Sequence, residues 1–125
     1  MNTDINILYV DDEFLNLQIF KFNFGKKFNV LVADSGDEGL RILADNASIS
    51  IVISDMKMPN MSGLEFIEIA KRMYPSICFY ILTGFGMNEE IQKAMDEKLI
   101  NRYFSKPLNL PLIESEILNA TGQNR

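Results

Sequence analysis

Apolar residues along this chain fall into two kinds of stretch: short unbroken runs, and longer stretches in which they recur every three or four positions. The short runs are rich in β-branched residues, which is typical of strands that are covered on both faces of a parallel sheet. They predict strands at residues 6–10, 29–33, 49–55, 77–83 and around 103–104.

The longer stretches have the spacing of amphipathic helices. They predict helices at residues 14–24, 36–46, 63–74 and 89–98, and a last helix after residue 109. Suitable caps precede the later four helices, at Ser35, Ser62, Asn88 and Asn109. The two serines are each followed three residues later by a glutamate, which is the pattern of a capping box.

The faces of these helices that turn toward the core follow from the same spacing. We expect the second and third helices to pack through Leu40, Leu43, Ala44, Leu64, Ile67 and Met73. The first helix, residues 14–24, is apolar on more than one face. That pattern indicates a buried helix more often than a surface for a partner.

Strands and helices alternate five times with no internal repeat. This order predicts a doubly wound α/β domain, with a central parallel sheet and helices on both faces. A chain of 125 residues has room for one such domain, so residues 1–125 are interpreted as a single unit. Residues 121–125 are interpreted as a tail or as the start of a linker.

Composition excludes several classes of function. The net charge of −5 argues against direct nucleic-acid binding. Without histidine, the chain cannot build a Ser-His or Cys-His nucleophile pair or a histidine metal site. The single cysteine, Cys78, lies in an apolar run and is expected to be a buried, reduced thiol. With no membrane span and no secretory signal, we expect a cytoplasmic protein.

Polar residues end four of the predicted strands: Asp11 and Asp12, Asp55, Thr83 and Lys106. The carboxyl ends of parallel strands meet at one edge of a sheet, where ligands bind. Three carboxylates together are costly unless a cation lies among them, and oxygen ligands suit Mg²⁺. A hydroxyl and an ammonium complete an anion pocket. The set predicts a phosphoryl group held covalently on a carboxylate, with Mg²⁺ and a lysine neutralising its charge.

These residues resemble the motifs of the receiver domains of two-component response regulators. The resemblance rests on four motifs in order: Asp-Asp, Asp-x-x-Met-Pro-x-x-x-Gly, Thr-Gly and Lys-Pro, which follow the first, third, fourth and fifth strands. It implies a flavodoxin-like (βα)5 fold with strand order 2-1-3-4-5. It also implies a signalling switch that is no dedicated enzyme, although it catalyses its own phosphorylation and dephosphorylation.

The resemblance assigns the phosphoryl group and the metal to particular residues. Asp55 becomes the phosphoacceptor. Asp12 is expected to bind Mg²⁺ directly and Asp11 mainly through water, while Lys57 supplies its backbone carbonyl. Lys57 and Phe85 stand at positions that tune dephosphorylation in the family, and the direction of their effect here is left open.

The resemblance also implies a switch. Thr83 and Lys106 are expected to contact the phosphoryl oxygens, and the ring of Tyr103 is expected to follow the Thr83 hydroxyl. Simple packing within the strand is the other interpretation of Tyr103. The bond between Lys106 and Pro107 is expected to be cis.

The partners follow from the chemistry of the donor. The chain has no histidine, so the phosphoryl group would come from a separate sensor histidine kinase or histidine phosphotransfer protein. A downstream partner, or a fused output domain, would contact the last two helices and the fifth strand.

Two alternative functions stay open: a pseudo-receiver that binds partners without phosphorylation, and a phosphatase with an aspartyl nucleophile. The phosphatase is disfavoured because Lys57 stands where its second acid would be.

Overall fold

The computed structural model describes residues 4–122, in which five strands and five helices alternate. In chain order these are β1 (Asn6–Val10), α1 (Phe14–Phe24), β2 (Asn29–Ala33), α2 (Gly36–Asp45), β3 (Ile49–Asp55), α3 (Gly63–Met73), β4 (Cys78–Thr83), α4 (Glu89–Asp96), β5 (Arg102–Ser105) and α5 (Leu110–Ala120). All strand pairs are parallel, and the sheet order is β2-β1-β3-β4-β5. The flavodoxin-like order and the doubly wound fold are therefore confirmed. Residues 123–125 of the predicted tail lie outside the described residues.

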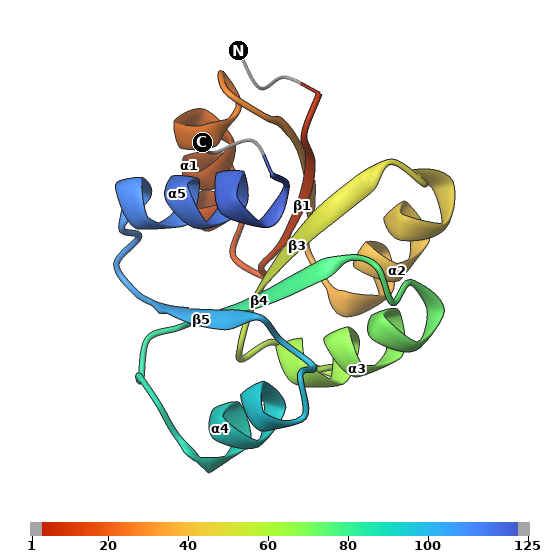
Figure 1. Cartoon of the computed structure of the whole chain (residues 1–125), viewed down its shortest axis with the longest axis vertical. Helices are drawn as coiled ribbons and strands as arrows, with labels where there is room; N and C mark the ends of the chain where they lie inside the picture. The colour runs from red at the N-terminus through yellow and green to blue at the C-terminus, as the bar shows by residue number, and fades with distance from the viewer. Residues whose placement is uncertain (1–3, 123–125) are drawn as a thin grey trace.

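The sheet lies between two layers of helices, α1 and α5 on one face and α2, α3 and α4 on the other (Figure 1). Successive residues of a strand point to opposite faces, so the central strands must be apolar on both. In β1, Leu8 and Val10 join the core beneath α2 to α4, whereas Ile7 and Tyr9 join the core beneath α1 and α5. This two-sided burial accounts for the unbroken apolar runs of the sequence.

The helix starts agree with the predicted caps. The side chains of Ser35, Ser62, Asn88 and Asn109 each accept a hydrogen bond from a backbone N–H in the first turn. The capping box is complete at Ser62, but at Ser35 the carboxylate of Glu38 pairs with Arg41 instead. Helix α4 ends at Asp96, before the predicted residue 98, because Lys98 has a left-handed backbone with φ of 60°.

Three predictions of burial are wrong. Ala44 is exposed because α2 approaches its neighbour through Gly36 and Gly39, and an added Cβ on Gly39 would lie 2.9 Å from the Phe66 ring. Met73, the last residue of α3, is also exposed. Cys78, a free thiol as predicted, is only partly buried.

Helix α1 differs from its prediction in a more informative way. Leu17, Phe20 and Phe24 are buried, but Phe14, Leu15 and Phe22 are 73%, 68% and 76% exposed. The expectation that this helix is buried on more than one face is therefore wrong. Leu17, Phe20 and Phe24 cover the sheet, whereas Phe14, Leu15 and Phe22 leave large apolar side chains in solvent. None of the helices within residues 4–122 is long and apolar enough to cross a bilayer.

Candidate functional site

The polar residues that end the strands lie together at one edge of the sheet. Carboxylate oxygens of Asp11, Asp12 and Asp55 all lie within 4.8 Å of one another. The Lys106 ammonium lies 2.8 Å from Oδ1 of Asp55. Thr83 ends β4, the strand beside Asp55, and its carbonyl accepts a hydrogen bond from the Lys106 N–H at 2.8 Å. The structure therefore brings together the acids, the hydroxyl and the ammonium that the sequence placed at strand ends.

Asp11 is fully buried, and both of its carboxylate oxygens accept hydrogen bonds. The Tyr9 hydroxyl donates to Oδ2 at 2.7 Å, and the Glu13 backbone N–H donates to Oδ1 at 3.0 Å. A carboxylate oxygen has two lone pairs, so each oxygen keeps the capacity to interact with a cation. Asp12, the next residue, is exposed.

Tyr9 lies on β1, and its ring stacks on Phe20 of α1 with a centroid distance of 4.1 Å and an interplanar angle of 5°. Burial of the ring, followed by the charge and hydrogen bond of Asp11, raises the pKa of the Tyr9 phenol above its ordinary value. The hydroxyl therefore remains a donor toward Asp11 at physiological pH. Tyr9 is not among the site residues predicted from the sequence, although it is a lone tyrosine in an aliphatic strand, two positions before Asp11.

Asp55 ends β3 and is buried. Burial raises the pKa of its carboxyl above the ordinary value; Lys106 opposes this shift, and the charge of Asp11 adds to it. For Lys106, burial lowers the pKa, but the hydrogen bond and charge of Asp55 outweigh burial and leave the pKa raised. One ammonium therefore holds Asp55 in place without cancelling the repulsion within the cluster.

Backbone hydrogen bonds hold the loop after β3 close to Asp55. The Met56 N–H donates to the Leu82 carbonyl at 3.0 Å, and the Gly63 N–H donates to the Met56 carbonyl at 2.9 Å. A Cβ on Gly63 would overlap the backbone carbonyl oxygen of Asp55. Only glycine permits this approach, which explains the glycine at the end of the motif that begins with Asp55.

The remaining predicted residues surround this centre. Thr83 is buried, and its Oγ1 accepts a hydrogen bond from the Phe85 N–H at 3.1 Å. The Lys57 ammonium lies 4.4 Å from the centroid of the exposed Phe85 ring. Tyr103 is half-buried on β5, where Ser105 and not Tyr103 stands opposite Thr83. The Thr83–Tyr103 switch therefore stays a prediction. The Lys106–Pro107 bond is cis, as the resemblance implied.

The donor set of the cluster fits Mg²⁺. Its three side chains offer only oxygen, and the exposure of Asp12 leaves room for water ligands, which Mg²⁺ retains. The hydrogen bonds to Asp11 fix one ligand without using up its lone pairs. Asp11, Asp12 and Asp55 could therefore hold a hard divalent cation.

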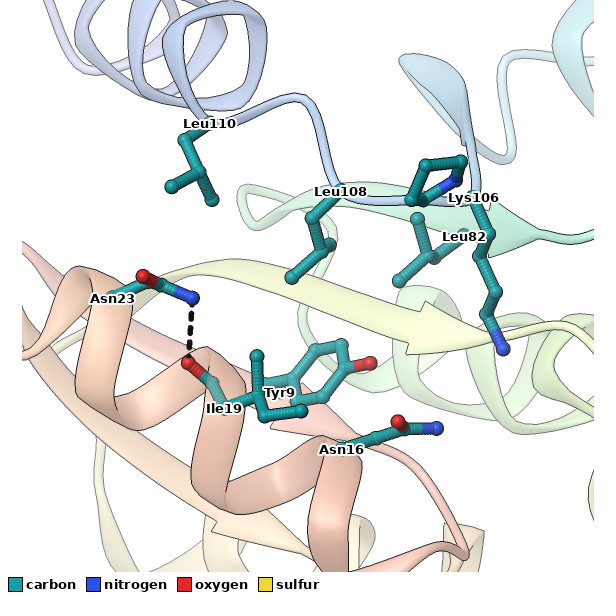
Figure 2. A pocket seen from close by; sticks show the side chains of 9 residues that line it. Tyr9, Asn16, Ile19, Asn23, Leu82, Lys106, Leu108 and Leu110 are labelled. Atoms are coloured by element: carbon teal, nitrogen blue, oxygen red, sulfur yellow. Dashed lines mark hydrogen bonds between the residues drawn. The ribbon is translucent and has the colours of Figure 1, made fainter.

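A cavity of about 310 Å³ opens beside the cluster, between α1 and the connection from β5 to α5 (Figure 2). Its lining includes Tyr9, Ile19, Lys106 and Leu108. Figure 2 shows the Tyr9 hydroxyl directed toward the side on which the Lys106 ammonium lies. The cavity therefore has Ile19 of α1 and Lys106, the partner of Asp55, in its wall.

Comparisons with known proteins agree on one family. The profile described as "Response regulator receiver domain" matches residues 7–118. The hydrogenase transcriptional regulatory protein HoxA of Cupriavidus necator is 30% identical over 101 residues, which cover 81% of this chain and 21% of HoxA. The sensor histidine kinase RcsC of Escherichia coli K12 is 28% identical over 117 residues, 93% of this chain and 12% of RcsC. The chain thus spans about a fifth or less of the length of these curated relatives.

Solved structures give the same result. A response regulator receiver domain protein from Clostridium thermocellum has a TM-score of 0.88 and 38% identity, and the match covers 95% of each chain. The response regulator TrrA of Thermotoga maritima, solved in complex with Mg²⁺-BeF, has a TM-score of 0.78 at 22% identity. That match covers 93% of this chain and 98% of TrrA, and at this identity it shows the fold alone.

Proposed function

Because this chain belongs to the response regulator receiver domain family of two-component signalling, we propose that it is a phosphorylation-dependent switch whose phosphoacceptor is Asp55. We further propose that residues 1–125 form one receiver domain, with residues 121–125 as a tail or the start of a linker. The observation that carries the proposal is the position of Asp55, buried at a strand end between Lys106 and the acids Asp11 and Asp12.

The chemistry is transfer of a phosphoryl group from a phosphohistidine. A carboxylate oxygen of Asp55 forms a bond to phosphorus, and the bond from phosphorus to the donor imidazole nitrogen breaks. The Lys106 ammonium lies close enough to Asp55 to neutralise charge on the transferred group. The Thr83 hydroxyl accepts from the Phe85 N–H, which leaves its own proton free to donate to a phosphoryl oxygen. Bound Mg²⁺ would supply the remaining charge neutralisation.

Receiver domains are signalling switches and not dedicated enzymes. Self-catalysed hydrolysis of the aspartyl phosphate is part of this proposal. A phosphatase acting on other phosphoesters is not favoured, since Lys57 stands at the sequence position where that class needs a second acid.

The proposal is tested with acetyl phosphate and Mg²⁺. We expect intact mass to show one added phosphoryl group and peptide mapping to place it on Asp55. Asp55→Asn should remain unlabelled, whereas Asp37→Asn, which alters an exposed acid in the first turn of α2, should label normally. Undiminished labelling of Asp55→Asn would refute the assignment.

The donor histidine lies outside residues 1–125, and we propose that the domain carrying it docks on α1. Phe14, Leu15 and Phe22 expose apolar surface on this helix, and Ile19 of the same helix lines the cavity that Lys106 also lines. A protein that presents phosphohistidine on a helix would bury this surface while reaching Asp55. Phe22→Ser should slow transfer from a phosphohistidine protein and leave labelling by acetyl phosphate unchanged. A wild-type rate of transfer from the phosphohistidine protein to Phe22→Ser would refute this docking surface.

The output is proposed to be a change in the surface formed by α4, β5 and α5. If a phosphoryl group draws the Thr83 hydroxyl toward Asp55, the space beside β5 changes and the Tyr103 ring can turn inward. Beryllofluoride, a phosphoryl mimic, should then shift the amide resonances around Tyr103 as well as those around Asp55. Shifts confined to the Asp55 pocket would contradict the coupling.

A further inference from the structure

We propose that Tyr9 is a positioning residue for the acidic cluster: its buried hydroxyl holds the Asp11 carboxylate in the orientation in which Asp11 shares a divalent cation with Asp12 and Asp55. The inference deepens the proposed function and rests on it, because it assigns a residue that sets how tightly the same site binds Mg²⁺. Tyr9 would not contact the metal or the phosphoryl group, and would act only through Asp11.

The first support is the number of contacts that Asp11 makes. Its Oδ2 is held by Tyr9 at 2.7 Å and its Oδ1 by the Glu13 N–H at 3.0 Å, and the side chain has no exposed surface. Rotation of the carboxylate plane would break both bonds, and breaking the bonds of a buried carboxylate is costly. The orientation of this acid is therefore set when the chain folds and not when a cation arrives.

The second support is that the Tyr9 hydroxyl is itself a fixed point. The Tyr9 ring lies flat against Phe20, and its backbone pairs with Val32 of β2 on one side and Ile53 of β3 on the other. Figure 2 shows the ring between α1 and the sheet, with the hydroxyl at the end nearer Lys106. A donor anchored in this way restrains Asp11 instead of following it.

The third support is the energetic consequence for a metal site. A ligand that is already oriented loses little conformational freedom when a cation binds. Hydrogen-bond partners of metal ligands typically change affinity by about 10- to 100-fold when they are removed. Loss of the Tyr9 hydroxyl would leave one oxygen of Asp11 without its donor and let the carboxylate turn away from the cluster.

Tyr80 provides a matched control within the same protein. It is also fully buried, its ring stacks on Phe104 at 5.4 Å, and its hydroxyl donates to the Glu116 carboxylate at 3.0 Å. Glu116 belongs to α5 and is not part of the acidic cluster. Tyr80→Phe therefore removes the same kind of bond from an equally buried tyrosine, although the acceptor Glu116 is partly exposed, and it does so without touching a proposed metal ligand.

The experiment compares wild type, Tyr9→Phe and Tyr80→Phe by calorimetric titration with Mg²⁺. We expect Tyr9→Phe to raise the Mg²⁺ dissociation constant about tenfold, and Tyr80→Phe to leave it at the wild-type value. Thermal melts in chelator should show that both variants fold. An ultraviolet difference spectrum gives a second measure. Adding Mg²⁺ should change the tyrosine absorption of wild type and Tyr80→Phe, and this change should be absent in Tyr9→Phe.

The outcomes separate this inference from the function on which it rests. A wild-type affinity in folded Tyr9→Phe would overturn the positioning role while leaving the Mg²⁺ site intact. Equal weakening in both variants would also overturn it, since the effect would then be general loss of rigidity. A wild-type protein that binds no Mg²⁺ would overturn the proposed function itself.

Discussion

The two sides of the candidate site differ in how firmly the fold holds them. On the side of β1 and the start of α3, Asp11 is buried and both of its carboxylate oxygens accept hydrogen bonds. Gly63 packs closely against the backbone carbonyl of Asp55. On the side of the loops after β3 and β4, Lys57 is exposed and rests on the ring of Phe85, which is 75% exposed. One side is part of the core, and the other is surface.

This difference indicates that the two sides of the site have different roles. Groups that bind a cation benefit from being ordered in advance, because their entropy is lost at folding and not at binding. Groups at the surface can move when a donor, a water or a partner approaches. Substitutions on the buried side should therefore alter stability and metal affinity together, whereas substitutions on the exposed side should alter neither by much.

The largest effect is expected from Gly63→Ala. The added methyl group would overlap the Asp55 carbonyl oxygen, and backbone cannot move aside as a flexible side chain can. We expect a loss of about 3 kcal/mol in the free energy of unfolding, together with weaker Mg²⁺ binding. Gly84→Ala is the control, because its methyl group would meet only Lys106 Cδ, at 3.9 Å. Urea unfolding of both variants measures the difference, and equal stability would show that the loop adjusts freely.

The next effect concerns Asp12, the exposed member of the cluster. Without a cation the three acids repel one another, so Asp12→Asn should melt higher than wild type in chelator at neutral pH. Wild type should gain roughly 2.7 kcal/mol at about 100 times its Mg²⁺ dissociation constant, and the variant should gain little. A variant that folds but melts lower in chelator would show that hydrogen bonds, and not repulsion, dominate the cluster.

Sequence alone predicted the strands and the site edge well. A strand buried on both faces leaves an unbroken apolar run, so its end, and thus the position of Asp55, can be located from the sequence. Parallel strands then bring their carboxyl ends to one edge, which is why Thr83 and Lys106 were placed near Asp55 without coordinates. Both inferences depend only on local pattern and sheet geometry.

Other features depend on contacts that pattern does not contain. The spacing of apolar residues places Phe14 and Phe22 in a helix, but it does not show whether another element of the fold covers their side chains. The burial of Phe66 beside Gly39 depends on how closely two helices approach. The Tyr9 hydroxyl reaches Asp11 only because both residues lie on β1 and its end, and because Phe20 fixes the ring. Such contacts are set by the packing of the whole domain.

A smaller effect is expected from pH, through Asp55. Burial raises its pKa in the folded state above that of the unfolded chain, so within that interval the folded state binds more protons. The destabilisation is complete above the folded pKa and is lost below the unfolded value of about 4. In chelator, the melting temperature should therefore rise as pH falls through the folded pKa of Asp55 toward the unfolded value, and Asp55→Asn should lose much of this rise. A flat wild-type profile would mean that Lys106 fully compensates the buried charge.

The smallest effect is expected on the exposed side, at Lys57 and Phe85. Their cation–π contact at 4.4 Å is solvent-exposed, and such contacts contribute about 0.5–1 kcal/mol. Lys57→Ala and Phe85→Ala should each change stability slightly, and a double-mutant cycle should recover a coupling of that size. Neither variant should shift the Mg²⁺ dissociation constant, because both side chains lie outside the acidic cluster.

The same double-mutant cycle, measured on the rate of aspartyl phosphate hydrolysis, should show coupling if Lys57 and Phe85 together restrict the access of water. Additive rates, or a change in Mg²⁺ affinity, would contradict the separation between a preorganised buried side and a responsive exposed one.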